Sequence, residues 1–163
     1  MLKIVAAALA IYSYILIQTS LPNLPPRIPT HFNFAGQPDG WGSPHTLWVM
    51  LAFQGLTACA MLSISFWARR FPKTVHLGTR RLSDCTPEQR ELILPLLDKL
   101  AGFMSVITSL FFIVLIREAI RAAGATRPQF HQGWAAVLFV GGMVGVSLYF
   151  VWRMNQVVKA TQG

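Results

Sequence analysis

Apolar residues in this chain gather into four long blocks separated by polar connections. The blocks cover residues 2–21, 46–68, 96–116 and 134–152. At a helical rise of about 1.5 Å per residue, each can cross a hydrocarbon layer of about 30 Å. They lack the alternation of membrane β-strands, and backbone groups in lipid must be satisfied within a segment, so each block is expected to be helical. The pattern predicts an all-α membrane protein, a four-transmembrane-helix bundle forming a single domain over residues 1–163.

Composition agrees with a membrane location. Hydrophobic residues make up 53% of the chain and charged residues only 12%, whereas soluble domains carry roughly 25% charged residues. A soluble core of buried helices would not need four separate runs of this length. The first block exceeds the apolar core of a signal peptide and ends without an Ala-x-Ala cleavage site, so we expect it to remain as a helix.

The net charge of +8 is unevenly placed along the chain. Half of the 14 basic residues lie between the second and third blocks or just inside the third: Arg69, Arg70, Lys73, Arg80, Arg81, Arg90 and Lys99. The positive-inside rule places this connection in the cytosol, which puts both termini inside and the other two loops outside. Nucleic acid is not an expected partner, because the basic loop lacks interleaved aromatic residues for base stacking.

The outer loop over residues 22–45 is dense in Pro, Gly and polar residues, and its prolines predict a stiff, extended start. In the alternating segment 30–34, an extended backbone would place Phe32 and Phe34 on one face and His31 and Asn33 on the other. The Pro-Asp-Gly sequence within residues 37–40 predicts a β-turn at which the chain doubles back.

Helix-boundary signals occur at several other places. Ser43 and Pro44 predict the start of the second helix, with His45 in its opening turn. A capping-box spacing at residues 86–89 predicts another helix start, with a bend at Pro95 from an interfacial segment into the third span.

Two further patterns concern packing and charge in the later spans. Glu118 and Arg121 are expected to pair on a solvated helix end. Small residues at intervals of four predict close helix packing within one bundle; they are Gly55, Cys59, Ser63, Ala101, Ser105, Ser109, Gly141 and Gly145.

Candidate chemistry concentrates on the predicted outer side. His31, His45 and His131 fall there together with Asp39. Imidazoles and a carboxylate are suitable ligands for zinc or a similar divalent ion, and three ligands with an open position could activate water. The alternative is structural, with His31 and Asn33 bonded to loop backbone and His45 capping a helix. No nucleophile elbow, phosphate loop or catalytic carboxylate pair is recognisable.

The segment Leu24-Pro-x-x-Ile-Pro-Thr-His-Phe-Asn-x-x-Gly-x-Pro-Asp-x-Trp-Gly-Ser43 resembles the signature of the bacterial membrane family called domain of unknown function 1648. This domain is also found in SdpI-like proteins, which are related to an immunity protein against a secreted peptide. The family commonly has Lys after the Gly-Ser pair, where this chain has Pro44 and His45. The resemblance implies the bacterial cytoplasmic membrane and a role in signalling or peptide-toxin protection.

Our leading hypothesis is a non-enzymatic binding, sensing or immunity module without a required cofactor. It would recognise a peptide or lipid-linked ligand at the outer face through His31, Asn33, Gly36, Asp39, Trp41, Ser43 and His45. The basic inner loop would contact a cytoplasmic protein or anionic lipid. The alternatives are a metal-dependent membrane enzyme that uses the outer histidines and a structural or permeation subunit.

Overall fold

The computed structural model describes residues 1–33, 35–77, 80–125 and 133–161. Four long helices dominate these ranges: α1 (Leu2–Ser20), α2 (Thr46–Arg70), α3 (Pro87–Ala123) and α4 (Gly133–Ala160). All four are long and apolar enough to cross a membrane. The predicted helical membrane bundle is therefore confirmed, and the protein is a multi-pass membrane protein. Helix α1 ends one residue before the end of its predicted block, whereas α2, α3 and α4 extend past theirs because their polar ends continue the same hydrogen-bonded turns.

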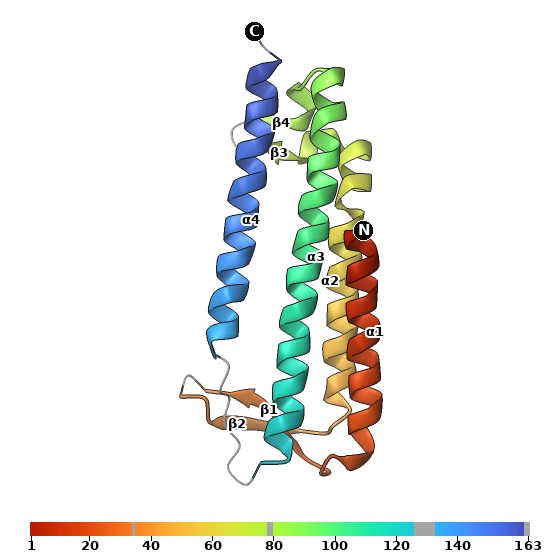
Figure 1. The fold of residues 1–163 in the computed structure, drawn as a ribbon, viewed down its shortest axis with the longest axis vertical. Helices are drawn as coiled ribbons and strands as arrows, with labels where there is room; N and C mark the ends of the chain where they lie inside the picture. The colour runs from red at the N-terminus through yellow and green to blue at the C-terminus, as the bar shows by residue number, and fades with distance from the viewer. Residues whose placement is uncertain (34, 78–79, 126–132, 162–163) are drawn as a thin grey trace.

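Helix α3 is the centre of the bundle and contacts each of the other three long helices (Figure 1). Its small residues Ala101, Ser105 and Ser109 are buried, as the ladder pattern predicts. At Gly102, an added Cβ would lie 2.8 Å from the Cβ of Leu2 in α1, so the close approach of these helices depends on glycine.

The glycine ladder of α4 behaves differently. An added Cβ at Gly141 or Gly145 would meet nothing within 4 Å, so these two positions do not pack inside the bundle. The expectation of intramolecular packing is confirmed for α3 and is wrong for this part of α4. The reason is that α4 contacts the bundle mainly through α3, which leaves most of the surface of α4 open.

Helix α3 begins at the predicted capping box. The Thr86 hydroxyl accepts a hydrogen bond from the Gln89 N–H (3.2 Å), and the Gln89 side-chain oxygen accepts one from the Thr86 N–H (3.0 Å). The helix then continues through Pro95 to Ala123 without interruption. The segment before Pro95 therefore belongs to the same helix as the third span, and apolar residues on both sides of the proline pack into one cluster. The bend at Pro95 stays a prediction.

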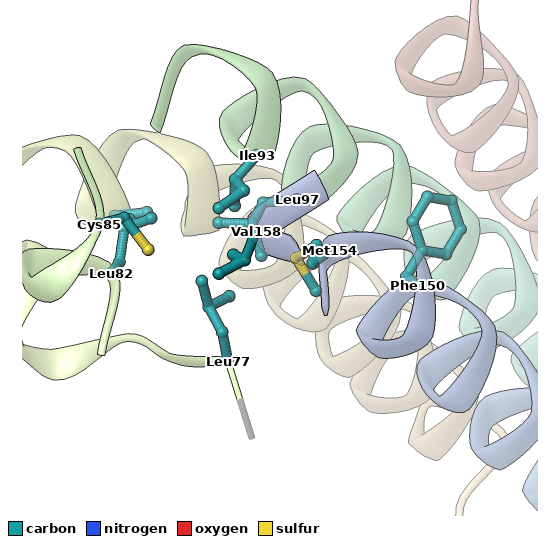
Figure 2. Close-up of a cluster of buried hydrophobic side chains, with 9 residues drawn as sticks. Leu77, Leu82, Cys85, Ile93, Leu97, Phe150, Met154 and Val158 are labelled. Atoms are coloured by element: carbon teal, nitrogen blue, oxygen red, sulfur yellow. The ribbon is translucent and has the colours of Figure 1, made fainter. Parts of the chain in front are cut away.

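A compact apolar cluster lies at the end of the bundle that carries the connection 71–86 (Figure 2). We call this end of the bundle the basic face. This connection contains η2 (Pro72–Thr74), β3 (His76–Leu77), β4 (Arg80–Arg81) and η3 (Leu82–Asp84). Its buried side chains Leu77, Leu82 and Cys85 pack against α3 and α4. The two helices contribute Ile93 and Leu97, and Phe150, Met154 and Val158, respectively. Arg90 reaches back from α3 and donates hydrogen bonds to the backbone oxygens of Leu82 and Ser83 (3.1 and 2.6 Å).

The opposite end of the bundle carries a β-hairpin, and we call this end the hairpin face (Figure 1). After α1 come η1 (Leu21–Asn23), β1 (Ile28–Phe32) and β2 (Pro38–Gly42), and the two strands pair antiparallel. Ile28 is 1% exposed and joins a cluster with residues of α1, α2 and α3, namely Ile17, Leu47, Ile116 and Ala119. The predicted outer loop is therefore a hairpin seated on the bundle.

Candidate functional site

The hairpin reverses direction at residues 33–37, which is earlier than the sequence predicts. The Asn33 side-chain oxygen accepts hydrogen bonds from the N–H groups of Ala35 and Gln37, each at 3.0 Å, and the Asn33 N–H donates to the Gln37 oxygen at 2.9 Å. Gly36 adopts a φ of 75°, which glycine tolerates best. The β-turn predicted at residues 37–40 is therefore wrong, because Asn33 supplies a side-chain turn and Pro38 begins the returning strand.

His31 and Asp39 meet across the hairpin. The His31 Nδ1 and an Asp39 carboxylate oxygen form an ion pair if the imidazole is protonated, and both side chains are exposed. An added Cβ at Gly40 would lie 2.9 Å from the His31 Cβ, so the glycine permits the strands to approach here. Phe32 is half-buried while His31 is exposed, as the alternating pattern predicts, and Phe34 lies outside the described residues.

A pocket of about 510 Å³ lies between this hairpin and the helices. Five consecutive residues, 29–33, line one side of it along β1. Helices α2, α3 and α4 contribute Met50, Leu115, Glu118, Ala119 and Gly133. The pocket thus combines one flank of the strand with largely apolar helix walls and a carboxylate.

Glu118 is the feature of this pocket that the sequence does not reveal. It is 2% exposed, and both carboxylate oxygens accept hydrogen bonds from the Arg121 guanidinium, at 3.1 and 2.7 Å. The predicted pair is confirmed, but the predicted solvated setting is wrong because β1 packs against α3 at this level. The signal in the sequence that could have indicated its burial is an acidic residue only two positions after the end of the apolar third block. This ion pair places a buried carboxylate in the pocket wall, with its charge compensated by Arg121.

The other predicted ligand-binding residues are spread along the hairpin and the start of α2. Gly36 lies in the pocket wall, while Trp41, Ser43 and His45 are outside the described lining. The Ser43 hydroxyl accepts a hydrogen bond from the His45 N–H at 3.3 Å, and the regular helix starts at Thr46. His45 occupies the position before the helix without a side-chain capping bond. The Ser43 side chain therefore accepts a bond from the N–H of His45, before the helix, and does not cap α2 itself. The ligand roles of all these residues stay predictions.

The predicted metal ligands come together only in part. Of the described residues, His31 and Asp39 touch each other, but no group of three or more His, Cys, Asp or Glu side chains is placed to hold a metal ion. His45 does not complete such a group with them, and His131 lies outside the described residues. Zinc binding that involves His131 therefore stays a prediction.

The first third of the chain matches a known family. The family model described as "Domain of unknown function (DUF1648)" covers residues 4–55. We call this matched segment the DUF1648 domain. It contains nearly all of α1, the whole hairpin and the first part of α2. Comparison with curated proteins and with solved structures gave no match.

The DUF1648 domain contributes the hairpin side of the pocket, and the rest of the chain contributes the other side. Residues 29–33 and Met50 belong to the domain, whereas Leu115, Glu118 and Gly133 do not. The pocket is therefore formed where the DUF1648 domain packs against α3, with Gly133 of α4 also in the described lining.

Proposed function

We propose that this multi-pass membrane protein is a non-enzymatic binding module that recognises a peptide or lipid-linked ligand in the hairpin pocket. The observation that carries the proposal is the pocket of about 510 Å³ between β1 and the helices, which brings a strand flank, apolar walls and a buried carboxylate together. Pockets of this size and mixed lining are typical of ligand sites.

An extended peptide fits this arrangement better than a lipid-linked ligand. The sheet has two strands, and β1 pairs along one edge with β2, while its residues 29–33 also line the pocket. A peptide laid along the second edge of β1 could form main-chain hydrogen bonds there and place alternate side chains against the helix walls.

The charges near the pocket favour a ligand with a cationic group. Glu118 lies in the wall, and Asp39 lies beside His31 at the rim. Arg121 already binds Glu118, so a ligand amine would share this carboxylate with the arginine or approach Asp39 instead. Opposite charges attract strongly where water is largely excluded, which would orient the peptide in the pocket.

The family resemblance and the charge distribution lead to a proposed orientation in the membrane and a proposed role in the cell. The hairpin face would lie outside a bacterial cytoplasmic membrane, with both termini in the cytosol, because the basic residues concentrate at the other end. Protection against a secreted peptide, or signalling of its presence, would follow from binding at the outer face, as in SdpI-like proteins. The basic connection 71–86 would transmit binding to a cytoplasmic protein.

Site-specific photo-crosslinking in cells of the native host would test the proposal. A benzophenone amino acid in place of Met50, which lines the pocket, should capture a peptide that is identified by mass spectrometry. The matched control is the same substitution at the neighbouring Val49, which is 52% exposed and outside the described lining. Adding His31→Ala to the Met50 variant should lower the yield, and this exposed side chain can change without disturbing the core.

A peptide adduct at Met50 that is absent at Val49 would support peptide recognition. An adduct that contains a lipid would instead show a lipid-linked ligand in the same pocket. Equal adducts at the two positions, or none at either, would contradict binding in the pocket.

A further inference from the structure

A second cavity lies near the basic face. It is bounded by the start of α1, by residues 96–103 of α3 and by residues 149–153 of α4. Its volume is about 840 Å³, and the DUF1648 hairpin takes no part in it. Three cationic side chains line it, one from each helix: Lys3, Lys99 and Arg153. We call this cavity the basic groove.

The charge of the basic groove is positive. Asp98 is the acidic residue in the described lining, and it forms an ion pair with Lys3 at 3.1 Å. It also accepts a hydrogen bond from the Ser65 hydroxyl of α2 at 3.1 Å. Lys99 and Arg153 are exposed, and within the described ranges neither forms a salt bridge. These two cations are therefore available to an anion.

The groove changes from basic to apolar along the bundle axis. Phe103 lies one helical turn beyond Lys99 on α3, and Phe150 lies about one turn before Arg153 on the antiparallel α4. Both aromatic residues are therefore about 4.5–6 Å closer to the hairpin face than the cation on the same helix. Their ring centroids are 6.0 Å apart. Leu2 of α1 also lines the cavity. Leu96 adds one apolar side chain nearer the basic face than Lys99, so a molecule in this groove would meet the cations between Leu96 and the two aromatic rings.

The uncharged stretch of α3 places the cations at the membrane surface. From Lys99 to Arg117 the helix rises about 27 Å with no charged residue between them, close to the thickness of the hydrocarbon layer. In Figure 1 the chain start lies well short of the tips of α3 and α4, which continue past this level. The cations therefore lie at the depth of the phospholipid headgroups, and the apolar part of the groove lies beside the acyl chains.

We propose that the basic groove binds an anionic phospholipid, with its headgroup phosphate between Lys99 and Arg153 and an acyl chain along Phe103 and Phe150. This site lies among the helices and is distinct from the connection 71–86, where the sequence predicts contact with anionic lipid. A free phosphate would use the cations alone and leave the apolar part of the groove unoccupied. The continuous apolar wall therefore favours a lipid.

Native mass spectrometry of the full chain in detergent would test this site. Phosphatidylglycerol should bind with higher affinity than phosphatidylcholine of the same chain length. The double variant Lys99→Gln, Arg153→Gln should weaken phosphatidylglycerol binding roughly 30-fold, about fivefold for each cation removed. Phe103→Ser should also weaken lipid binding, because it removes part of the acyl-chain wall.

The matched control is Arg27→Gln, Lys159→Gln, which removes the same charge from two exposed positions outside both the described lining and the connection 71–86. It should change affinity less than twofold. Equal losses in the two double variants, or equal binding of the two lipids, would overturn the proposal. Displacement of the lipid by millimolar inorganic phosphate, together with no effect of Phe103→Ser, would identify a free-phosphate site and would also overturn it.

Discussion

Truncation of Ile28 should loosen the hairpin from the bundle. Ile28 is 1% exposed and packs at the hairpin face with Ile17, Leu47 and Ile116. The Ile28→Ala change removes three carbon atoms, which corresponds to about 2.4 kcal/mol at about 0.8 kcal/mol per buried carbon. The cavity that remains adds to this loss, and buried Ile→Ala changes generally cost about 2–5 kcal/mol.

Amide hydrogen exchange of the protein in detergent would measure this loss locally. If the hairpin opens as a unit, a loss of about 2.4 kcal/mol should raise the exchange rates of the protected amides in β1 and β2 about 50-fold, since about 1.4 kcal/mol corresponds to a factor of ten. Amides in the middle of α3 should keep their rates if the opening is confined to the hairpin.

Two variants calibrate the measurement. Ile28→Val removes one carbon and should cost about 0.5–1.5 kcal/mol. Ile15→Ala changes a residue of α1 that is 53% exposed, so it should leave exchange in the hairpin unchanged. Exchange rates in Ile28→Ala that stay within twofold of the wild type would refute the conclusion that Ile28 anchors the hairpin.

Three further changes test local features. Gly36→Ala should destabilise the hairpin by about 1–2 kcal/mol because of the φ of 75°, seen as faster exchange in β1 and β2 with α4 unaffected; unchanged exchange would contradict the turn geometry. Thr86→Ala should lower the stability of α3 by about 1 kcal/mol in denaturant titrations, because it removes the N-cap hydroxyl. Thr86→Ser is the control that keeps this hydroxyl, and equal losses of stability in the two variants would argue against the capping box. Lys3→Ala should cost less than about 1 kcal/mol, because the side chains of Lys3 and Asp98 are 55% and 44% exposed, and a loss above 2 kcal/mol in the same titration would show a stronger contact.

The helices could be predicted from the sequence because the bilayer imposes a single strong rule on the backbone. Long apolar runs must close their hydrogen bonds internally, so each block becomes a helix whatever its neighbours are. The capping box at Thr86 was equally predictable, since all of its hydrogen bonds join residues three positions apart.

The hairpin turn was less predictable because two local signals compete for it. Pro38, Asp39 and Gly40 are all favourable turn residues, yet Asn33 organises the reversal through two side-chain hydrogen bonds. Turn propensity does not indicate which signal prevails, because the seating of Ile28 on three helices also fixes where the strand can run.

Local sequence signals also fail to predict the whole candidate site, because its residues are far apart in the sequence. His31 and Asp39 could be placed together as residues of one loop, whereas Glu118 lies far away in the sequence. Its burial depends on the packing of β1 against α3, a contact that no local pattern encodes. The sequence therefore predicted the hairpin side of the pocket and missed the helix side.

The account depends most on the hairpin face lying outside a membrane that the chain crosses four times. Single cysteines can be introduced by Gln37→Cys in the hairpin and Lys73→Cys at the basic face, after Cys59 and Cys85 are replaced by serine. Labelling of intact cells with a membrane-impermeant maleimide should modify the Gln37→Cys protein, and the Lys73→Cys protein should react only after permeabilisation. Labelling of the Lys73→Cys protein in intact cells, with the Gln37→Cys protein protected, would contradict the account.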